Sequence, residues 1–316
     1  MRIVLRPMAV LTAAALLASC TRVGQGPATS SAPELQVVTT FLPITEFTRA
    51  VAGDCATVQA LIPANVGPHD FQATPSDLVR LQNASVLVKN GLGLEEFLDK
   101  LISGAGNAKL KVIDSSAGIA TLANPEQKPE SGHDHAHDHG HDHGPINPHI
   151  WLDPLRAVQQ VETIRDGLIA AKPACKEQFT ANAASFSAQL RALDAELAAR
   201  LKPFAGKTFV AFHDFAPYFA DRYKLSASFV VEAPEENPSP ADLQRVARQV
   251  KQSDLKALLS EPQEGSRSFN ALAADLGVRV SVFDPLETGP AEADQPGYYA
   301  AQMRRNVNDL VGAFGS

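Results

Sequence analysis

Residues 174–201 read ACKEQFTANAASFSAQLRALDAELAARL, the longest uninterrupted helical pattern in the chain. Apolar residues recur every three or four positions, which is the spacing of one face of an α-helix. They are Phe179, Ala183, Phe186, Leu190, Leu193, Leu197 and Leu201. A helix of this length would extend roughly 40 Å, enough to run along a whole molecule. We predict one rigid helix over 173–203 that joins two lobes; a long surface helix is the alternative.

Strand and helix patterns alternate on both sides of this helix. Before it, short apolar or β-branched runs at 35–40, 57–62, 86–89 and 111–113 alternate with helical patterns at 44–52, 75–83 and 94–102. After it, runs at 208–212, 227–231, 257–260 and 279–283 alternate with helical patterns at 217–223, 239–252, 266–276 and 297–314. Such alternation predicts mostly parallel sheets flanked by helices. The expected fold class is α/β, with similar lobes over 35–172 and 204–316.

The amino terminus resembles a secretory signal over residues 1–19. An apolar stretch at 8–18 follows two arginines and is too short to span a bilayer. It ends in Leu17-Ala18-Ser19-Cys20, which resembles a bacterial lipobox and implies cleavage before Cys20 and a lipid on its sulfur. An ordinary signal peptide followed by a chance cysteine is the alternative. Residues 20–34 are rich in Gly, Ser, Thr and Pro and predict a flexible tether. The expected location is periplasmic or otherwise extracytoplasmic, with the lipid anchor as the only membrane contact.

The net charge of the chain indicates which kinds of partner it is suited to bind. The chain of 316 residues has a formal net charge of −7, and removal of residues 1–19 would make the balance more acidic. An acidic surface argues against nucleic acid as a partner and suits the capture of cations. No later apolar run is long enough for a transmembrane helix.

A histidine-rich tract interrupts the first lobe. Residues 133–143 read HDHAHDHGHDH, inside an insertion over 124–147. The histidines are His133, His135, His137, His139, His141 and His143. The tract has no apolar residue larger than alanine, so we expect it to lie in water. Imidazole is a common ligand of zinc, copper and nickel, which predicts an auxiliary metal-binding loop of modest affinity. An engineered affinity tag is the alternative, although tags sit at chain termini.

The remaining histidines and one aspartate occupy related positions in the predicted sheets. His69 comes just after the second strand run, and His149 directly precedes a predicted helix. His213 and Asp284 each follow a strand run directly. Sites in open α/β sheets form at the carboxyl ends of strands, so we expect these side chains to converge, two from each lobe. Three neutral imidazoles and one carboxylate form a tetrahedral set that suits Zn²⁺.

The motifs around these residues resemble a known family. They are GPHDFQATPSD (67–77), NPHIWLDP (147–154), FVAFHDFAPYF (209–219), EAPEENPSP (232–240), LLSEPQ (258–263) and VFDPL (282–286). From about Leu35 to the C-terminus the chain resembles the cluster A-I solute-binding proteins of ABC transporters. Among these, it is most similar to the zinc-binding subunits of high-affinity zinc uptake systems.

The resemblance implies two lobes, one long connecting helix and one buried metal ion between the lobes. It implies His69, His149 and His213 as ligands, and Asp284 aligns with the carboxylate. In zinc-binding members, water or a nearby glutamate can take the fourth position, with the aspartate alongside. Manganese- and iron-binding members typically carry Glu where this chain has His213, so His213 favours zinc. We expect Glu261 beside the site or on the surface rather than as a ligand.

The expected function is therefore delivery of Zn²⁺, as a transported ligand, to an ABC permease and its ATPase. We expect a monomer without enzymatic activity. A manganese- or iron-binding member of the family is one alternative. A lipid-anchored zinc hydrolase is another, although the HExxH and GxSxG motifs are absent from the sequence. An adhesin or metallochaperone of the same fold is a third.

Cys55 and Cys175 remain after the lipobox cysteine. They lack CxxC spacing and neighbouring histidines, which argues against a structural zinc site. An oxidising compartment permits a disulfide. Cys55 precedes a strand, and Cys175 follows a helix that returns to the same amino edge of the sheet. We therefore expect a disulfide between them.

Overall fold

The computed structural model describes residues 34–124, 145–234, 236–253, 257–262 and 267–315. The predicted signal peptide, Cys20 and the histidine-rich tract with His133, His135, His137, His139, His141 and His143 lie outside these residues. Among the described helices, none has the length and apolar composition needed to cross a bilayer. Residues 34–316 form one compact unit.

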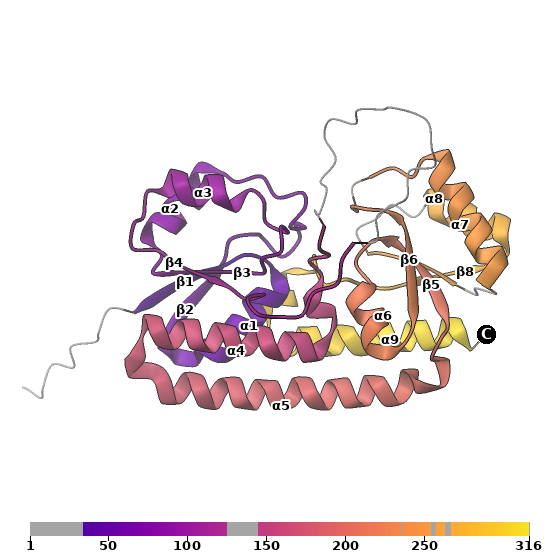
Figure 1. Ribbon diagram of the computed structural model, residues 1–316. Coiled ribbons are helices and arrows are strands. Elements are labelled where there is room, and N and C mark those ends of the chain that lie inside the picture. Colours follow the sequence, from indigo (N-terminus) through magenta and orange to yellow (C-terminus); the bar gives the residue numbers. More distant parts are fainter. Residues whose placement is uncertain (1–33, 125–144, 235, 254–256, 263–266, 316) are drawn as a thin grey trace, which may run out of the picture. The chain divides into compact units, whose positions relative to one another are not determined.

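The first sheet is wholly parallel and has the strand order β2-β1-β3-β4 (Figure 1). Its strands are β1 (Leu35–Thr39), β2 (Ala56–Ala60), β3 (Val86–Lys89) and β4 (Lys111–Asp114). Alternate residues of the inner strands enter different cores, as the pleat requires. Val37 and Val88 face the main core, whereas Val38 and Leu87 face a smaller core with α2 (Pro75–Asn83) and α3 (Leu98–Ala105). Burial on both faces explains why Val37, Val38, Leu87 and Val88 are all apolar although successive side chains face opposite sides.

The second sheet repeats this topology, with the parallel order β6-β5-β7-β8. Its strands are β5 (Thr208–His213), β6 (Ser226–Val231), β7 (Ala257–Ser260) and β8 (Arg279–Val282). Helix α6 (Pro217–Tyr223) connects β5 to β6, while α7 (Pro240–Ser253) and α8 (Arg267–Leu276) cover one face (Figure 1). Val210 and Leu258 pack there against Val246 and Phe269 in a core of their own. The predicted α/β class with two similar lobes is confirmed.

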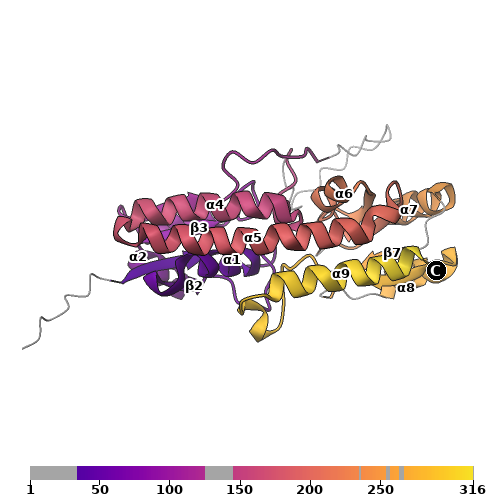
Figure 2. The same ribbon diagram turned by 90° about the horizontal axis from the view of Figure 1, so that it is seen from below.

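Long helices lie along the other face of both sheets. Helix α5 (Lys176–Leu201) follows a short 3₁₀ turn, η3 (Pro173–Cys175), and packs against α4 (Pro154–Ala171) and α9 (Tyr298–Phe314) (Figures 1 and 2). Its buried residues join the core that contains Val37 of the first sheet and Phe209 of the second. The prediction of one long helix between the lobes is therefore confirmed.

The C-terminal segment returns to the first lobe. The carboxylate of Glu46, on α1 (Leu42–Ala52), accepts hydrogen bonds from the backbone N–H groups of Gly297 (2.7 Å) and Tyr299 (2.8 Å). These groups open helix α9, where a negative charge is favourable. Burial raises the pKa of Glu46, and the two N–H groups oppose that rise. Arg49 also forms an ion pair with Asp294 (2.7 Å). The helix expected within the second lobe thus begins against the first.

A disulfide joins Cys55 and Cys175, with the two Cα atoms 6.3 Å apart. Cys55 ends the 3₁₀ turn η1 (Gly53–Cys55) directly before β2, and Cys175 ends η3 directly before α5. The bond therefore lies at the amino edge of the first sheet, and the predicted disulfide is present.

Candidate metal centre

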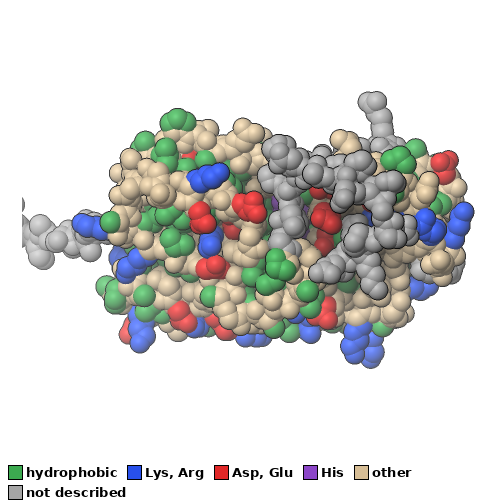
Figure 3. Space-filling view, turned by 45° about the horizontal axis from the view of Figure 1, so that its top comes forward, with side chains coloured by type: hydrophobic (Ala, Val, Ile, Leu, Met, Phe, Trp, Pro, Cys, Tyr) green, Lys and Arg blue, Asp and Glu red, His purple; other side chains and the backbone are tan. Residues whose placement is uncertain are grey.

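Two loops and the end of a strand bring His69, His149 and His213 together. His69 lies in the loop after β2, His149 directly precedes the 3₁₀ turn η2 (Ile150–Leu152), and His213 is the last residue of β5. Their ring centroids are 5.2 to 6.0 Å apart, and all three side chains are buried. Only a small area of histidine is visible in the space-filling view (Figure 3). The structure thus has the convergence that we expected from the carboxyl ends of the strands.

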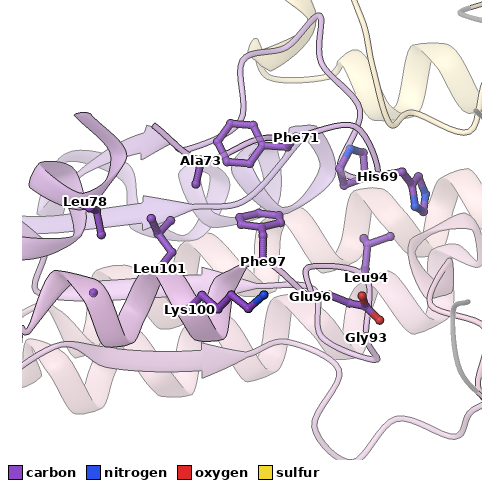
Figure 4. A pocket seen from close by; sticks show the side chains of 12 residues that line it. His69, Phe71, Ala73, Leu78, Gly93, Leu94, Glu96, Phe97, Lys100 and Leu101 are labelled. Atoms are coloured by element: carbon purple, nitrogen blue, oxygen red, sulfur yellow. The ribbon is translucent and has the colours of Figure 1, made fainter. Parts of the chain in front are cut away.

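His69 also lies at one end of an apolar groove of about 650 Å³ on the first lobe (Figure 4). Phe71 and Phe97 pack against each other along this groove, with ring centroids 4.9 Å apart. The loop that carries His69 is therefore held against the first lobe by aromatic packing.

Glu287 supplies the carboxylate of the group. Its Oε1 lies 3.1 Å from Nε2 of His69, 3.0 Å from Nε2 of His149 and 3.7 Å from Nε2 of His213. One candidate ligand atom from each of the four residues lies within 4.8 Å of the others. Oε2 of Glu287 is buried and has no hydrogen-bond partner among the described residues. Three nitrogens and one oxygen, all buried, fit the donor preferences of zinc.

Asp284, the carboxylate expected as the fourth ligand, is not a member of this group. Its Oδ1 accepts a hydrogen bond from the backbone N–H of Leu286 (2.8 Å), so the side chain folds back on its own turn. Leu286 adopts a left-handed conformation with φ of 65°, which few non-glycine residues do. This turn gives Glu287, rather than Asp284, access to the histidines. Burial, together with the charges of Glu287 and Glu261, raises the pKa of Asp284 to about 6.

Two neighbours orient the imidazole rings. Nδ1 of His149 lies 2.9 Å from Oδ1 of Asn147, and Nδ1 of His213 lies 2.6 and 2.7 Å from the carboxylate oxygens of Glu261. When each Nδ1–H donates to these acceptors, Nε2 of both rings is left as the ligand atom. Glu261 is buried beside the site, which is one of the two places that the sequence left open for it.

The carboxylates set the charge of the site. Burial lowers the pKa of His149 to about 4, so this imidazole is neutral at pH 7. Burial acts in the same direction on His213, but the charges of Glu261 and Glu287 outweigh it and raise its pKa well above 6.5. Burial would raise the pKa of Glu287, yet the charges of His69 and His213 hold it well below 4.5. Without a metal, the site therefore holds an ionised Glu287 beside a protonated His213.

The sequence left a nearby glutamate open as the fourth ligand but did not identify it as Glu287, and the role of Asn147 was missed. Glu287 lies directly after the VFDPL motif, and Asn147 opens the NPHIWLDP motif. For each of the two residues, the available signal in the sequence was its position close to a motif residue already singled out as a candidate ligand.

A family model described as "Zinc-uptake complex component A periplasmic", ZnuA, matches residues 37–313. The chain belongs to the ZnuA family. It is 33% identical over 279 residues to the zinc-binding lipoprotein AdcA of Streptococcus pneumoniae, covering 88% of this chain and 55% of that protein. It thus spans about half the length of AdcA. It is 31% identical over 288 residues to the high-affinity zinc uptake system protein ZnuA of Bacillus subtilis, covering 90% of this chain and 89% of that protein.

The likeness to ZnuA proteins extends to the fold. The Zn(II)-bound ZnuA-like domain of S. pneumoniae AdcA superposes with a TM-score of 0.73 at 30% identity. The match covers 90% of this chain and 100% of that domain.

Proposed function

We propose that this chain is an extracytoplasmic zinc-binding protein that delivers Zn²⁺ to an ABC permease and its ATPase. The buried group of His69, His149, His213 and Glu287 carries the proposal, with Zn²⁺ as cargo. Relatives named as zinc-binding and zinc-uptake proteins support it. Anchoring through a lipid on Cys20 and action as a monomer belong to the same proposal.

The donor set favours capture of zinc over catalysis. Catalytic zinc sites use three protein ligands and leave one position for water, whereas four side chains converge here. The carboxylates of Glu287 and Glu261 would balance the charge of Zn²⁺, which lowers the cost of burying the ion. Imidazole at position 213, rather than a carboxylate, disfavours manganese. We therefore propose transport rather than hydrolysis.

Exchange of Glu287 for Gln should weaken zinc binding by about 100-fold, or about 2.7 kcal/mol. The substitution keeps the size of the side chain and removes the negative charge of one ligand. Asp284→Asn is the matched control, because the Asn oxygen can still accept from the N–H of Leu286. We expect the control to change the affinity by less than about fivefold.

Both variants are measured by titrating metal-free protein against a chromophoric chelator of known affinity. A larger loss for Asp284→Asn than for Glu287→Gln would assign the fourth ligand to Asp284. No tight site in the unaltered protein would refute the proposed function.

Zinc binding at pH 7 should release about one proton, because the metal must displace the proton on His213. The raised pKa means that this proton stabilises the metal-free protein below about pH 6.5. That stabilisation is lost as the pH rises through the folded-state pKa. Zinc affinity should rise with pH over the same window.

The proton count follows from calorimetric heats in buffers that differ in ionisation enthalpy. Glu261→Gln removes a charge that raises the pKa of His213, so this variant should release fewer protons. Binding without proton release in the unaltered protein would contradict the inference that His213 is protonated when the metal is absent.

A further inference from the structure

The turn that carries Glu287 is fastened to the two loops that carry His69 and His149. The backbone carbonyl of Pro285 accepts a hydrogen bond from the indole Nε1–H of Trp151 (2.8 Å). The backbone N–H of Gly289 donates to the carbonyl of Ala64 (2.7 Å). Trp151 follows His149 by two residues, and Ala64 precedes His69 in the loop after β2. The position of Glu287 therefore depends on segments of the first lobe.

We propose that Trp151 is a positioning residue for zinc binding. Its indole N–H holds the turn of residues 284–289 in the conformation that presents Glu287, rather than Asp284, to the three histidines. Trp151 contributes no ligand atom and acts through Glu287. This inference rests on the proposed function and adds a residue on which the affinity depends.

Packing fixes the direction of the indole N–H. Trp151 is fully buried, with its ring 4.9 Å from that of Phe41 and 5.1 Å from that of His149. Its backbone carbonyl accepts a hydrogen bond from the hydroxyl of Tyr299 (2.7 Å). A buried indole N–H requires an acceptor, and here the carbonyl of Pro285 accepts from it. Moving the turn away would leave two buried polar groups unpaired.

The turn needs this external support because its backbone is strained. Leu286 holds a left-handed φ of 65° although it is not glycine, and such residues persist where their surroundings over-determine them. Asn306 holds the other side of the turn, through bonds to the N–H (3.0 Å) and carbonyl (2.7 Å) of Asp284. Between the two supports, the left-handed residue decides which carboxylate reaches the site.

The test is Trp151→Phe, which keeps an aromatic ring and removes the N–H donor. Zinc affinity should fall about 10- to 100-fold, the usual effect of losing a residue that orients a ligand. Tyr299→Phe is the matched control: it removes a buried hydrogen bond to the same residue but none to the turn. Its affinity should stay within about threefold of the unaltered protein.

A double mutant distinguishes a positioning role of Trp151 from a general disruption of the protein structure. If Trp151 acts through Glu287, adding Trp151→Phe to Glu287→Gln should cause little further loss of affinity. Additive losses would overturn the inference, as would unchanged affinity in the single variant when the unaltered protein binds zinc tightly. Absence of tight binding in the unaltered protein would instead refute the proposed function.

Thermal unfolding of the metal-free variants checks folding. If Trp151→Phe does not fold, β-(3-benzothienyl)alanine at position 151 preserves the shape of the indole and removes only the N–H. The same loss of affinity is expected for that protein, and retained affinity would overturn the inference.

Discussion

Replacing His149 by alanine should lower the zinc affinity by roughly 70- to 900-fold. His149 is fully buried, and its Nε2 lies 3.0 Å from Glu287 and 3.3 Å from Nε2 of His213. A four-ligand zinc site is worth roughly 10–16 kcal/mol, or about 2.5–4 kcal/mol for each ligand. Each factor of ten corresponds to about 1.4 kcal/mol, which gives the expected range.

Ligand-dependent stabilisation measures this loss independently of the chelator assay. Zinc at about 1,000 times its dissociation constant should stabilise the unaltered protein by about 4 kcal/mol. If His149→Ala raises that constant to match the zinc concentration, the stabilisation falls to about 0.4 kcal/mol. Leu168→Ala is the control, because Leu168 is buried on α4 and lies outside the metal group. It should lower stability without changing affinity.

The same pair of variants tests delivery. In cells that lack the chain, uptake of radioactive zinc at low external concentration should be restored by the unaltered protein and by Leu168→Ala. His149→Ala should fail to restore it. Tight zinc binding by His149→Ala would remove this residue from the site.

Loss of the disulfide should destabilise the protein by about 4–5 kcal/mol and lower its melting temperature by roughly 10 °C. The bond joins residues separated by 120 positions, so in the entropy model it removes many conformations of the unfolded chain. Alanine at Cys55 and Cys175 should give the same shift as reduction of the unaltered protein, measured by thermal unfolding.

Zinc affinity should be unaffected by this change. The disulfide lies at the amino edge of the first sheet, whereas the metal group lies beyond the carboxyl ends of the strands. An unchanged melting temperature would contradict the predicted stabilisation. A parallel loss of zinc affinity would show coupling between the two edges.

Local signals in the sequence predicted most of the fold. Helix α4 begins at Pro154, with Asp153 accepting the backbone N–H of Leu155 (2.8 Å) as its N-cap, and both residue types are typical of a helix start. The helix expected over 94–102 instead begins at Leu98. Gly91, Leu92 and Gly93, which precede this helix, all have positive φ values and lengthen the turn after β3. Periodicity and helix caps can be recognised from residue types in a short stretch of sequence. The length of that turn depends on backbone dihedral angles, which the residue types did not indicate.

The candidate site likewise has residues that could be predicted from the sequence and residues that could not. His69 and His213 could be predicted because each follows a predicted parallel strand, and such strands place their carboxyl ends at one edge of a sheet. His149 could be added because it directly precedes a predicted helix. The choice of Glu287 over Asp284 could not, because the two residues share one turn and either could have faced the histidines. That choice depends on the left-handed Leu286 and on a hydrogen bond between residues 134 positions apart. Neither feature leaves a pattern in the neighbouring sequence.

The contact between Glu46 and the start of α9 affects when the first lobe can fold during synthesis of the chain. The two partners lie 251 positions apart, so the buried carboxylate of the first lobe has no N–H groups to bind until nearly the whole chain exists. Domains usually fold as they leave the ribosome, N-terminal part first. Here we expect the first lobe to stay incomplete until the last helix arrives. We expect a nascent chain with this property to remain unfolded for longer, and an unfolded chain is the form that can thread through a narrow secretion channel.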